Sequence, residues 1–212
     1  MQVCKAILIL AALSPCVGVL SAQQPNSASE ASRKEYLDKF PWTTANTTVG
    51  DAMMLRILVE SRGAKNGVEV GTNTGFGAIN MGIGFERTGG HLTTMDINPL
   101  MVTAARDHLA KVGLDKIVTV IEGDALKVLP TLEGPYDFVF LDARKPDYLK
   151  YLKALEPKLK VGATLVADNV IDYAKQMPDF LEYIQSSPLY DTVIIRASMQ
   201  KNDGMSVSYK IR

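Results

Sequence analysis

Two aspartates and an asparagine follow two of the most apolar runs of the chain. Asp142 comes directly after residues 136–141, and Asp168-Asn169 comes directly after residues 163–167. If both runs are parallel strands, their carboxyl ends meet at one edge of the sheet, where open α/β sheets bind ligands. Carboxylate and amide oxygens suit a hard divalent cation better than Zn²⁺. The sequence therefore predicts a site for Mg²⁺, with Ca²⁺ or Mn²⁺ as alternatives, made by Asp142, Asp168 and Asn169.

Lys145 is the candidate proton acceptor beside this site, because it lies three residues after Asp142. A nearby divalent cation disfavours the charged form of a lysine and leaves an amine that can take a proton. The alternative is a surface lysine paired with Asp147. The two histidines are expected elsewhere, His91 at the start of a strand and His108 on a solvent-exposed helix face.

A second candidate site is the glycine turn at residues 68–77, Val-Glu-Val-Gly-Thr-Asn-Thr-Gly-Phe-Gly. Glycines let the backbone adopt positive φ and approach a ligand closely. The turn opens a predicted helix, whose first amides can donate hydrogen bonds. Its Glu-x-Gly-x-x-x-Gly spacing differs from the Gly-x-Gly-x-x-Gly of dinucleotide-binding enzymes. The alternative is a plain tight connection between strand and helix.

Two further carboxylates favour a cofactor at this turn. Asp96 ends the next predicted strand, 25 residues after Gly71, where a carboxylate can accept both hydroxyls of a ribose. Asp124 follows the third predicted strand, within reach of an adenine. Each alone is equally an exposed turn residue or a helix cap. Ligand-type residues at three successive strand ends favour a nucleoside-containing cofactor.

The elements that must position these residues alternate along the chain, which predicts an α/β fold with a doubly wound, mostly parallel sheet. The final two strands have no helix between them, only a turn at Asn202-Asp203-Gly204, so they are expected to pair antiparallel. The predicted strands are 68–70, 91–95, 117–121, 136–141, 163–167, 192–197 and 205–211, and the predicted helices are 34–40, 51–61, 76–83, 98–112, 148–155 and 178–185.

The first 22 residues have the composition of a secretory signal peptide. Lys5 is the only charged residue up to Ala22, and the apolar run is too short for a membrane span. We therefore expect export after cleavage near Ala22, with a cytoplasmic location as the alternative. Residues 23–33 are expected to be a flexible linker, and residues 34–212 a single domain.

Composition limits the chemistry and the partners of this domain. Both cysteines, Cys4 and Cys16, lie in the predicted signal peptide, so the body has no thiolate ligand or cysteine nucleophile. Lys and Arg total 23, as do Asp and Glu, so the net charge gives no indication of nucleic-acid binding. A small-molecule partner is expected. The sequence does not decide between a monomer and a homodimer.

Five motifs in one order make the chain recognisable. From about Thr47 onward it resembles the Mg²⁺-dependent class I O-methyltransferases, the family of catechol and caffeoyl-CoA O-methyltransferases. The motifs are Thr48-Val49-Gly50-Asp51, Glu69-Val70-Gly71-Thr72-Asn73-Thr74-Gly75-Phe76, Met95-Asp96-Ile97-Asn98-Pro99, Phe140-Leu141-Asp142-Ala143-Arg144-Lys145 and Ala167-Asp168-Asn169-Val170.

The resemblance implies a Rossmann-like sheet of seven strands, the last antiparallel, with helices on both faces. It implies S-adenosylmethionine as cofactor, Mg²⁺ held by Asp142, Asp168 and Asn169, and Lys145 as the base that deprotonates a catechol-like or vicinal dihydroxy aromatic acceptor. The motifs and the resemblance together place these residues around the cofactor: Val49, Glu69, Gly71, Thr72, Gly75, Phe76, Gly77, Asp96, Ile97, Asp124, Ala125 and Asp142.

The acceptor side departs from the catechol enzymes, which carry a late glutamate for the second hydroxyl. No glutamate follows Glu182 here, so Asp203 of the Asp-Gly turn is the expected substitute, and Trp42 is a candidate aromatic wall. Trp42, Lys145, Asn169 and Asp203 are thus the expected acceptor contacts. The alternatives are a methyltransferase acting on another acceptor, such as a hydroxylated tRNA base, and a non-catalytic module that binds the cofactor.

Overall fold

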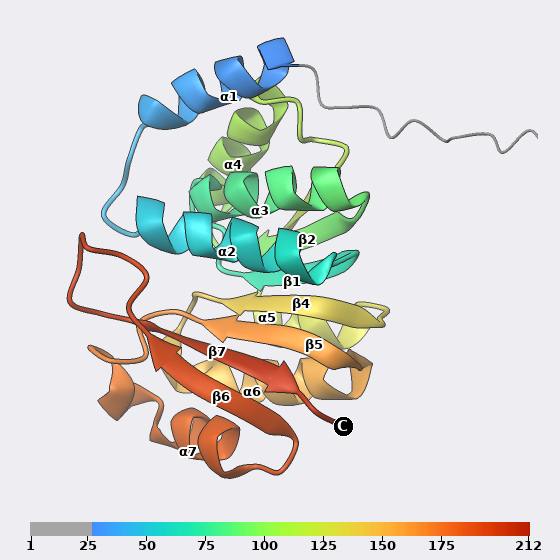
Figure 1. The fold of residues 1–212 in the computed structure, drawn as a ribbon, viewed down its shortest axis with the longest axis vertical. Helices are drawn as coiled ribbons and strands as arrows, with labels where there is room; N and C mark the ends of the chain where they lie inside the picture. The colour runs from blue at the N-terminus through green and yellow to red at the C-terminus, as the bar shows by residue number, and fades with distance from the viewer. Residues whose placement is uncertain (1–26) are drawn as a thin grey trace, which may run out of the picture.

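The computed structural model describes residues 27–212 (Figure 1). The predicted signal peptide, with its cleavage position near Ala22, lies outside the described residues, as does the first part of the predicted linker. The second part, residues 27–33, is not a linker but begins helix α1 (Ser27–Asp38). A contact with a residue far away in the sequence holds this helix, because Arg33 Nε donates to the carbonyl oxygen of Val112 at 2.8 Å. Among residues 27–212, no helix has the length and apolar character needed to cross a bilayer.

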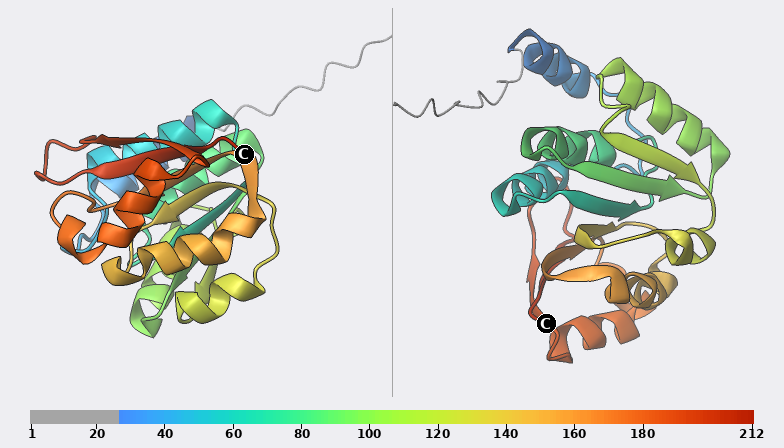
Figure 2. Two further views of the ribbon diagram at one scale, coloured as in Figure 1. Left: turned by 90° about the horizontal axis from the view of Figure 1, so that it is seen from below. Right: turned by 90° about the vertical axis from the view of Figure 1, so that its right-hand side faces the viewer.

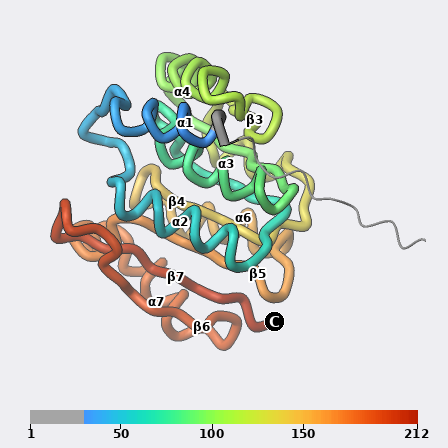
Figure 3. The backbone as a smooth tube through the Cα atoms, turned by 45° about the horizontal axis from the view of Figure 1, so that its top comes forward, coloured from blue at the N-terminus to red at the C-terminus, as the bar shows by residue number. Residues whose placement is uncertain are grey.

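The predicted seven-stranded, mostly parallel sheet is confirmed, in the order β3-β2-β1-β4-β5-β7-β6. Strand β7 runs antiparallel to both of its neighbours, whereas β1 to β5 pair in parallel. Figure 3 shows the β6 and β7 hairpin at the end of the sheet opposite β3. The strands are β1 (Asn66–Val70), β2 (His91–Asp96), β3 (Val118–Glu122), β4 (Tyr136–Leu141), β5 (Leu159–Ala167), β6 (Tyr190–Ile195) and β7 (Met205–Lys210).

Helices cover both faces of the sheet, as predicted (Figure 2). One face packs against α2, α3 and α4, and the other against α5, α6 and α7. Strand β4 is buried on both sides, since Phe138 and Phe140 face the first group while Val139 and Leu141 face the second. The helices are α2 (Val49–Arg62), α3 (Phe76–Thr88), α4 (Pro99–Lys111), α5 (Ala125–Val128), α6 (Tyr148–Leu155) and α7 (Pro178–Ser186).

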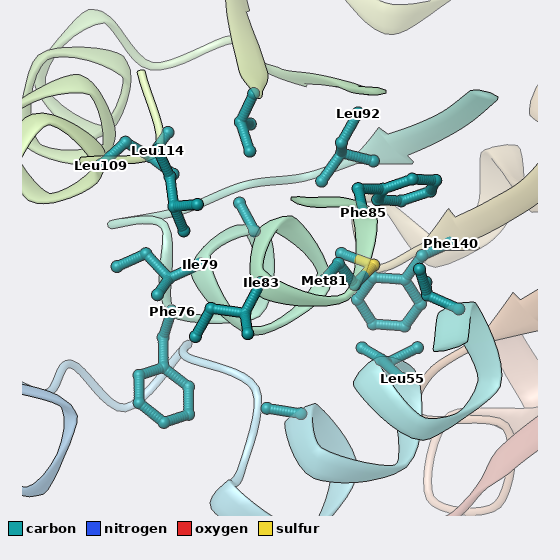
Figure 4. Close-up of a cluster of buried hydrophobic side chains, with 14 of the residues drawn as sticks. Leu55, Phe76, Ile79, Met81, Ile83, Phe85, Leu92, Leu109, Leu114 and Phe140 are labelled. Atoms are coloured by element: carbon teal, nitrogen blue, oxygen red, sulfur yellow. The ribbon is translucent and has the colours of Figure 1, made fainter. Parts of the chain in front are cut away.

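Local chemistry sets the start of α4 and the end of α2. The Asn98 side chain accepts from the amide of Leu100 at 3.0 Å, and Pro99 takes the first helical position of α4. Gly63 ends α2 with φ at 60°, in the left-handed region that favours glycine. Helix α3 passes through the centre of a buried apolar cluster, in which Figure 4 shows Ile79, Met81 and Phe85. The helix that follows the glycine turn is thus firmly packed.

The prediction for His108 is wrong, because its side chain is almost fully buried. Its Nδ1 lies 2.8 Å from the carbonyl oxygen of Thr74, and its ring packs edge-on against Phe40 and Tyr36. The covering residues come from α1 and the segment after it, so the pattern within α4 carries no sign of them. The prediction for His91, at the start of β2, is confirmed.

Candidate active site

Two adjoining pockets lie at the carboxyl ends of the parallel strands. The first has a volume of about 500 Å³ and is lined by the residues that follow β1, β2, β3 and β4. Half of the twelve residues predicted to bind a cofactor line this pocket. They are Gly71, Asp96, Ile97, Asp124, Ala125 and Asp142.

The glycine turn brings the backbone of β1 against that of β4. Gly71 has φ at 97°, and a Cβ atom there would lie 2.1 Å from the carbonyl oxygen of Asp142. Only glycine allows both the conformation and this approach. The end of β1 therefore forms one wall of the first pocket, directly beside Asp142.

The carboxylate of Asp96 is fixed at the rim of the first pocket. One oxygen accepts from the amide of Asn73 and the other from the amide of Asn98, both at 2.9 Å. Each carboxylate oxygen has a second lone pair, so the group can still accept two hydroxyls of a ligand. Asp124 combines two roles, because it lines the pocket and also caps α5 by accepting from the amide of Leu126 at 3.0 Å.

The other six predicted cofactor residues lie outside the lining of the first pocket. Glu69 is buried beneath the turn, where it accepts a hydrogen bond from the hydroxyl of Thr94. Gly77 packs directly over Glu69, the ring of Phe76 contacts that of Trp42 at a tilt of 45°, and Val49 lies half-exposed at the start of α2. Thr72 and Gly75 complete the turn behind the pocket wall.

The burial of Glu69 predicts a specific dependence of stability on pH. Burial raises the pKa of Glu69 from an ordinary 4.5 to about 8, against the opposing hydrogen bond from Thr94. Between these values the unfolded chain is ionised at this residue while the folded chain stays protonated. Folding stability from this group is therefore complete below pH 4.5 and is lost as pH rises to 8, by up to about 1.4 kcal/mol per pH unit.

Glu69→Gln removes this titration and keeps the side-chain shape. Urea unfolding from pH 5.5 to pH 7.5 should show the variant gaining stability relative to the wild type as pH rises. A constant difference between the two proteins across this range would contradict the assignment.

The second pocket, of about 780 Å³, gathers the residues predicted to hold a metal and a proton. Asp142, Lys145, Asp168 and Asn169 all line it, and Asp142 lines the first pocket as well. The two pockets therefore meet at the end of β4. Tyr173 also lines the second pocket.

Lys145 is held inside the second pocket rather than on the surface. Its Nζ donates to Asp142 Oδ1 and to the hydroxyl of Tyr148, both at 2.9 Å. Burial raises the pKa of Tyr148, so its hydroxyl stays neutral and in turn donates to the carbonyl oxygen of Asp168 at 3.2 Å. The alternative pairing with Asp147 is not formed.

Asp168 is almost fully buried and is paired with a lysine that sequence reasoning missed. The Nζ of Lys201 lies 2.8 Å and 3.0 Å from the two carboxylate oxygens of Asp168, and 3.2 Å from Asp51 Oδ2. Burial and the neighbouring carboxylate of Asp142 raise the pKa of Asp168, while Lys201 opposes this shift. Burial disfavours the ammonium of Lys201, but Asp168 and Asp51 outweigh it and raise the pKa of Lys201.

Asn169 has a fixed amide orientation. Its backbone is left-handed, with φ at 61°, and its Nδ2 donates to Asp203 Oδ2 at 2.9 Å. Asp203 also accepts from the amides of Ile171, Asp172 and Gly204, and these bonds outweigh burial and lower the pKa of Asp203. Because the Asn169 nitrogen is engaged, its Oδ1 is the amide atom left for a ligand.

The structure thus places two of the expected acceptor contacts away from the second pocket. Asp203 lies behind Asn169 and is buried, and Trp42 packs against Phe76 outside the pocket lining. Tyr173, which sequence reasoning missed, presents a partly exposed ring there, with Lys145 Nζ 5.9 Å from its centroid. An aromatic residue close after Asp168-Asn169 was the signal available in the sequence.

A family model described as O-methyltransferase matches residues 20–179, well over half of the chain. The chain belongs to the O-methyltransferase family. This membership confirms the predicted class of enzyme, an S-adenosylmethionine-dependent O-methyltransferase. The prediction from the motifs of residues 48–170 is thus confirmed at the level of family and fold.

Individual relatives support this family, and solved structures support the fold. Caffeoyl-CoA O-methyltransferase from Medicago sativa is 27% identical over 199 residues, covering 84% of this chain and 80% of the relative. The solved structure of cofactor-bound Rv0187 from MTB is 26% identical, with a TM-score of 0.76 over 90% of this chain and 93% of that one. The O-methyltransferase from Bacillus cereus in complex with SAH shares the fold, with a TM-score of 0.74 at 22% identity over 89% of this chain and 93% of that one.

The donors at the second pocket fit a hard cation. Within residues 27–212, no three His, Cys, Asp or Glu side chains form a metal-binding group, and the predicted set reaches three donors only through the amide of Asn169. Both carboxylates of the set already accept from an ammonium group, Asp142 from Lys145 and Asp168 from Lys201. Their oxygens therefore face positions where positive charge is stable, and the free amide oxygen of Asn169 completes an oxygen-only set of the kind that Mg²⁺ prefers.

Proposed function

We propose that this O-methyltransferase moves the methyl group of S-adenosylmethionine, bound in the first pocket, to one hydroxyl of a catechol-like or vicinal dihydroxy aromatic in the second, in a Mg²⁺-dependent reaction. The observation that carries the proposal is the position of Asp142, which lines both pockets and holds Lys145 Nζ at 2.9 Å. Donor and acceptor can therefore meet beside a group able to take a proton. Similarity to caffeoyl-CoA O-methyltransferases supports this class of acceptor.

The first pocket suits the nucleoside part of the donor. Its volume of about 500 Å³ lies within the range of small-ligand pockets. The fixed carboxylate of Asp96 can accept both ribose hydroxyls. The side chain of Ile97, which is 70% exposed beside it, offers an apolar surface for a flat base. Asp124 then lies within the same pocket for the polar edge of the base.

On the acceptor side, Tyr173 offers a ring face and Lys145 the proton acceptor. Asp142, Asp168 and the Asn169 amide oxygen would hold Mg²⁺, which would supply positive charge that favours the ionised form of an acceptor hydroxyl. Lys145 takes the hydroxyl proton on Nζ while Asp142 and Tyr148 keep that nitrogen in place. The wall shared by the two pockets would bring an acceptor hydroxyl close to the methyl donor, and such positioning supplies much of the rate of a transfer reaction.

The test is methyl transfer from labelled S-adenosylmethionine to catechol by the full chain. We expect turnover with Mg²⁺, a loss of about 100-fold or more in excess EDTA, and recovery when Mg²⁺ is added back. Unfolding curves with and without EDTA serve as the control that the fold survives chelation. Full activity in EDTA would remove the metal from the proposal, and no transfer to any vicinal dihydroxy aromatic would remove the acceptor class.

A further inference from the structure

Lys201 places a positive charge on one of the proposed metal ligands. It lies between β6 and β7, and its Nζ contacts both carboxylate oxygens of Asp168, at 2.8 Å and 3.0 Å. We propose that Lys201 competes with the divalent cation for Asp168. Lys201 must leave Asp168 before the ion can bind, and this competition sets the affinity of the site. This inference rests on the proposed Mg²⁺ site.

Burial explains why a lysine is kept on Asp168. Asp168 and Asp51 are both almost fully buried, and the same ammonium lies between them, 3.2 Å from Asp51 Oδ2. Two carboxylates removed from water need a positive partner, because an unpaired buried charge is strongly destabilising. Without a metal ion, Lys201 is that partner.

The geometry favours exchange over joint occupancy. The ammonium of Lys201 lies within hydrogen-bond distance of both carboxylate oxygens of Asp168. A divalent ion on the same carboxylate would stand close to this ammonium, and like charges at such a separation repel each other. The other lysine of the site, Lys145, contacts Asp142 instead. Departure of Lys201 removes the repulsion and frees both oxygens of Asp168.

Lys201 can leave without loss of the segment that carries it. Its side chain is 23% exposed, so it has access to solvent. The segment has its own attachments to α2, since the amide of Val49 donates to Gln200 Oε1 at 3.0 Å and Ala197 packs against Gly50. Asp51 also keeps a bond from the hydroxyl of Thr48 at 2.7 Å. A variant at position 201 should therefore keep the fold, at a stability lowered by the loss of the two ion pairs.

The experiment measures Mn²⁺ binding by calorimetry to chelator-treated full chain at one pH. Lys201→Met should bind Mn²⁺ at least about tenfold more tightly than the wild type, because no ammonium has to be displaced. Lys201→Arg keeps the charge and should bind like the wild type. Lys160→Met is the matched control, since it breaks a lysine–aspartate pair with Asp137 that lies outside both pockets.

Each outcome decides the inference. The inference is overturned if Lys201→Met binds Mn²⁺ as tightly as the wild type or more weakly, and also if Lys201→Arg binds it more tightly. In both cases, Mn²⁺ binding by the wild type would still support the proposed metal site. If no protein binds Mn²⁺, both proposals fail. If only Lys201→Met binds, the competition stands and the metal dependence of the wild type fails. Should Lys201→Met not fold, Lys201→Gln, which can still donate to Asp168, takes its place with the same expectation.

Discussion

Replacing Lys145 with methionine is expected to lower kcat by about 10²- to 10⁴-fold, the contribution of a well-placed general base. The side chain of Lys145 is only 12% exposed, and its nitrogen is held by Asp142 and Tyr148 in the second pocket. Methionine retains the volume and loses the atom that takes the proton. Steady-state methyl transfer to catechol gives kcat, and calorimetry with S-adenosylhomocysteine reports on the first pocket, whose affinity should stay unchanged.

Two further variants separate a base from a structural charge. Lys145→Arg retains the ion pair with Asp142, but a guanidinium does not give up its proton, so it should be as slow as Lys145→Met. Lys153→Met removes a more exposed lysine that pairs with Glu156 away from both pockets, and it should turn over normally. Recovery of turnover in Lys145→Arg would show that Lys145 acts through its charge alone.

Gly71→Ala is expected to cause the second large effect, on stability and on binding of the methyl donor. The new Cβ would lie 2.1 Å from the carbonyl oxygen of Asp142, in a backbone with φ at 97°. Both the clash and the conformation oppose any side chain, so we expect a loss of about 3 to 5 kcal/mol in the free energy of unfolding. Urea unfolding gives this value, and calorimetry should detect little binding of S-adenosylhomocysteine.

Gly63→Ala is the matched control, because it separates conformation from contact. Gly63 is also left-handed, with φ at 60°, but a Cβ atom there would have no neighbour within 4 Å. Its cost should be that of the left-handed conformation alone, about 1 to 2 kcal/mol. If Gly71→Ala costs no more than Gly63→Ala, the approach of Gly71 to Asp142 does not constrain the turn.

The sheet and the residues at its edge could be predicted because their signals are local. The continuous apolar run before Asp142 indicates a strand covered on both faces. The pair Asn98-Pro99 marks a helix start with its own hydrogen bond. Parallel pairing then brings Asp142 and Asp168 to one edge, where the structure has them lining one pocket.

The errors come from contacts between segments that are far apart in the sequence. His108 is buried because Phe40 and Tyr36 reach it from another part of the chain. Residues 27–33 have no apolar pattern, and Arg33 holds them through Val112, 79 residues away. No periodicity within either element records these partners.

One acceptor-side expectation shows the same limit on a smaller scale. Asp203 is matched through its Asp-Gly turn, but the direction of its side chain follows from the hydrogen bonds that it accepts from the amides of Ile171 and Asp172.

Glu69, a residue predicted on the cofactor side, offered a usable signal. A carboxylate between Val68 and Val70, in a strand covered on both faces, has to be buried, and this favours a protonated acid over an exposed ligand.

The place of β7 within the sheet has a consequence for synthesis of the enzyme. Strand β7 follows the other six strands in the sequence, yet it pairs with β5 on one side and β6 on the other. Until it has left the ribosome, β6 has no partner strand and β5 has one open edge. Asp203, just ahead of β7, is also missing, so Asn169 lacks the group that orients its amide. The amino-terminal half can collapse during translation, but Asn169 gains its orienting partner only once the segment that leads into β7 has emerged.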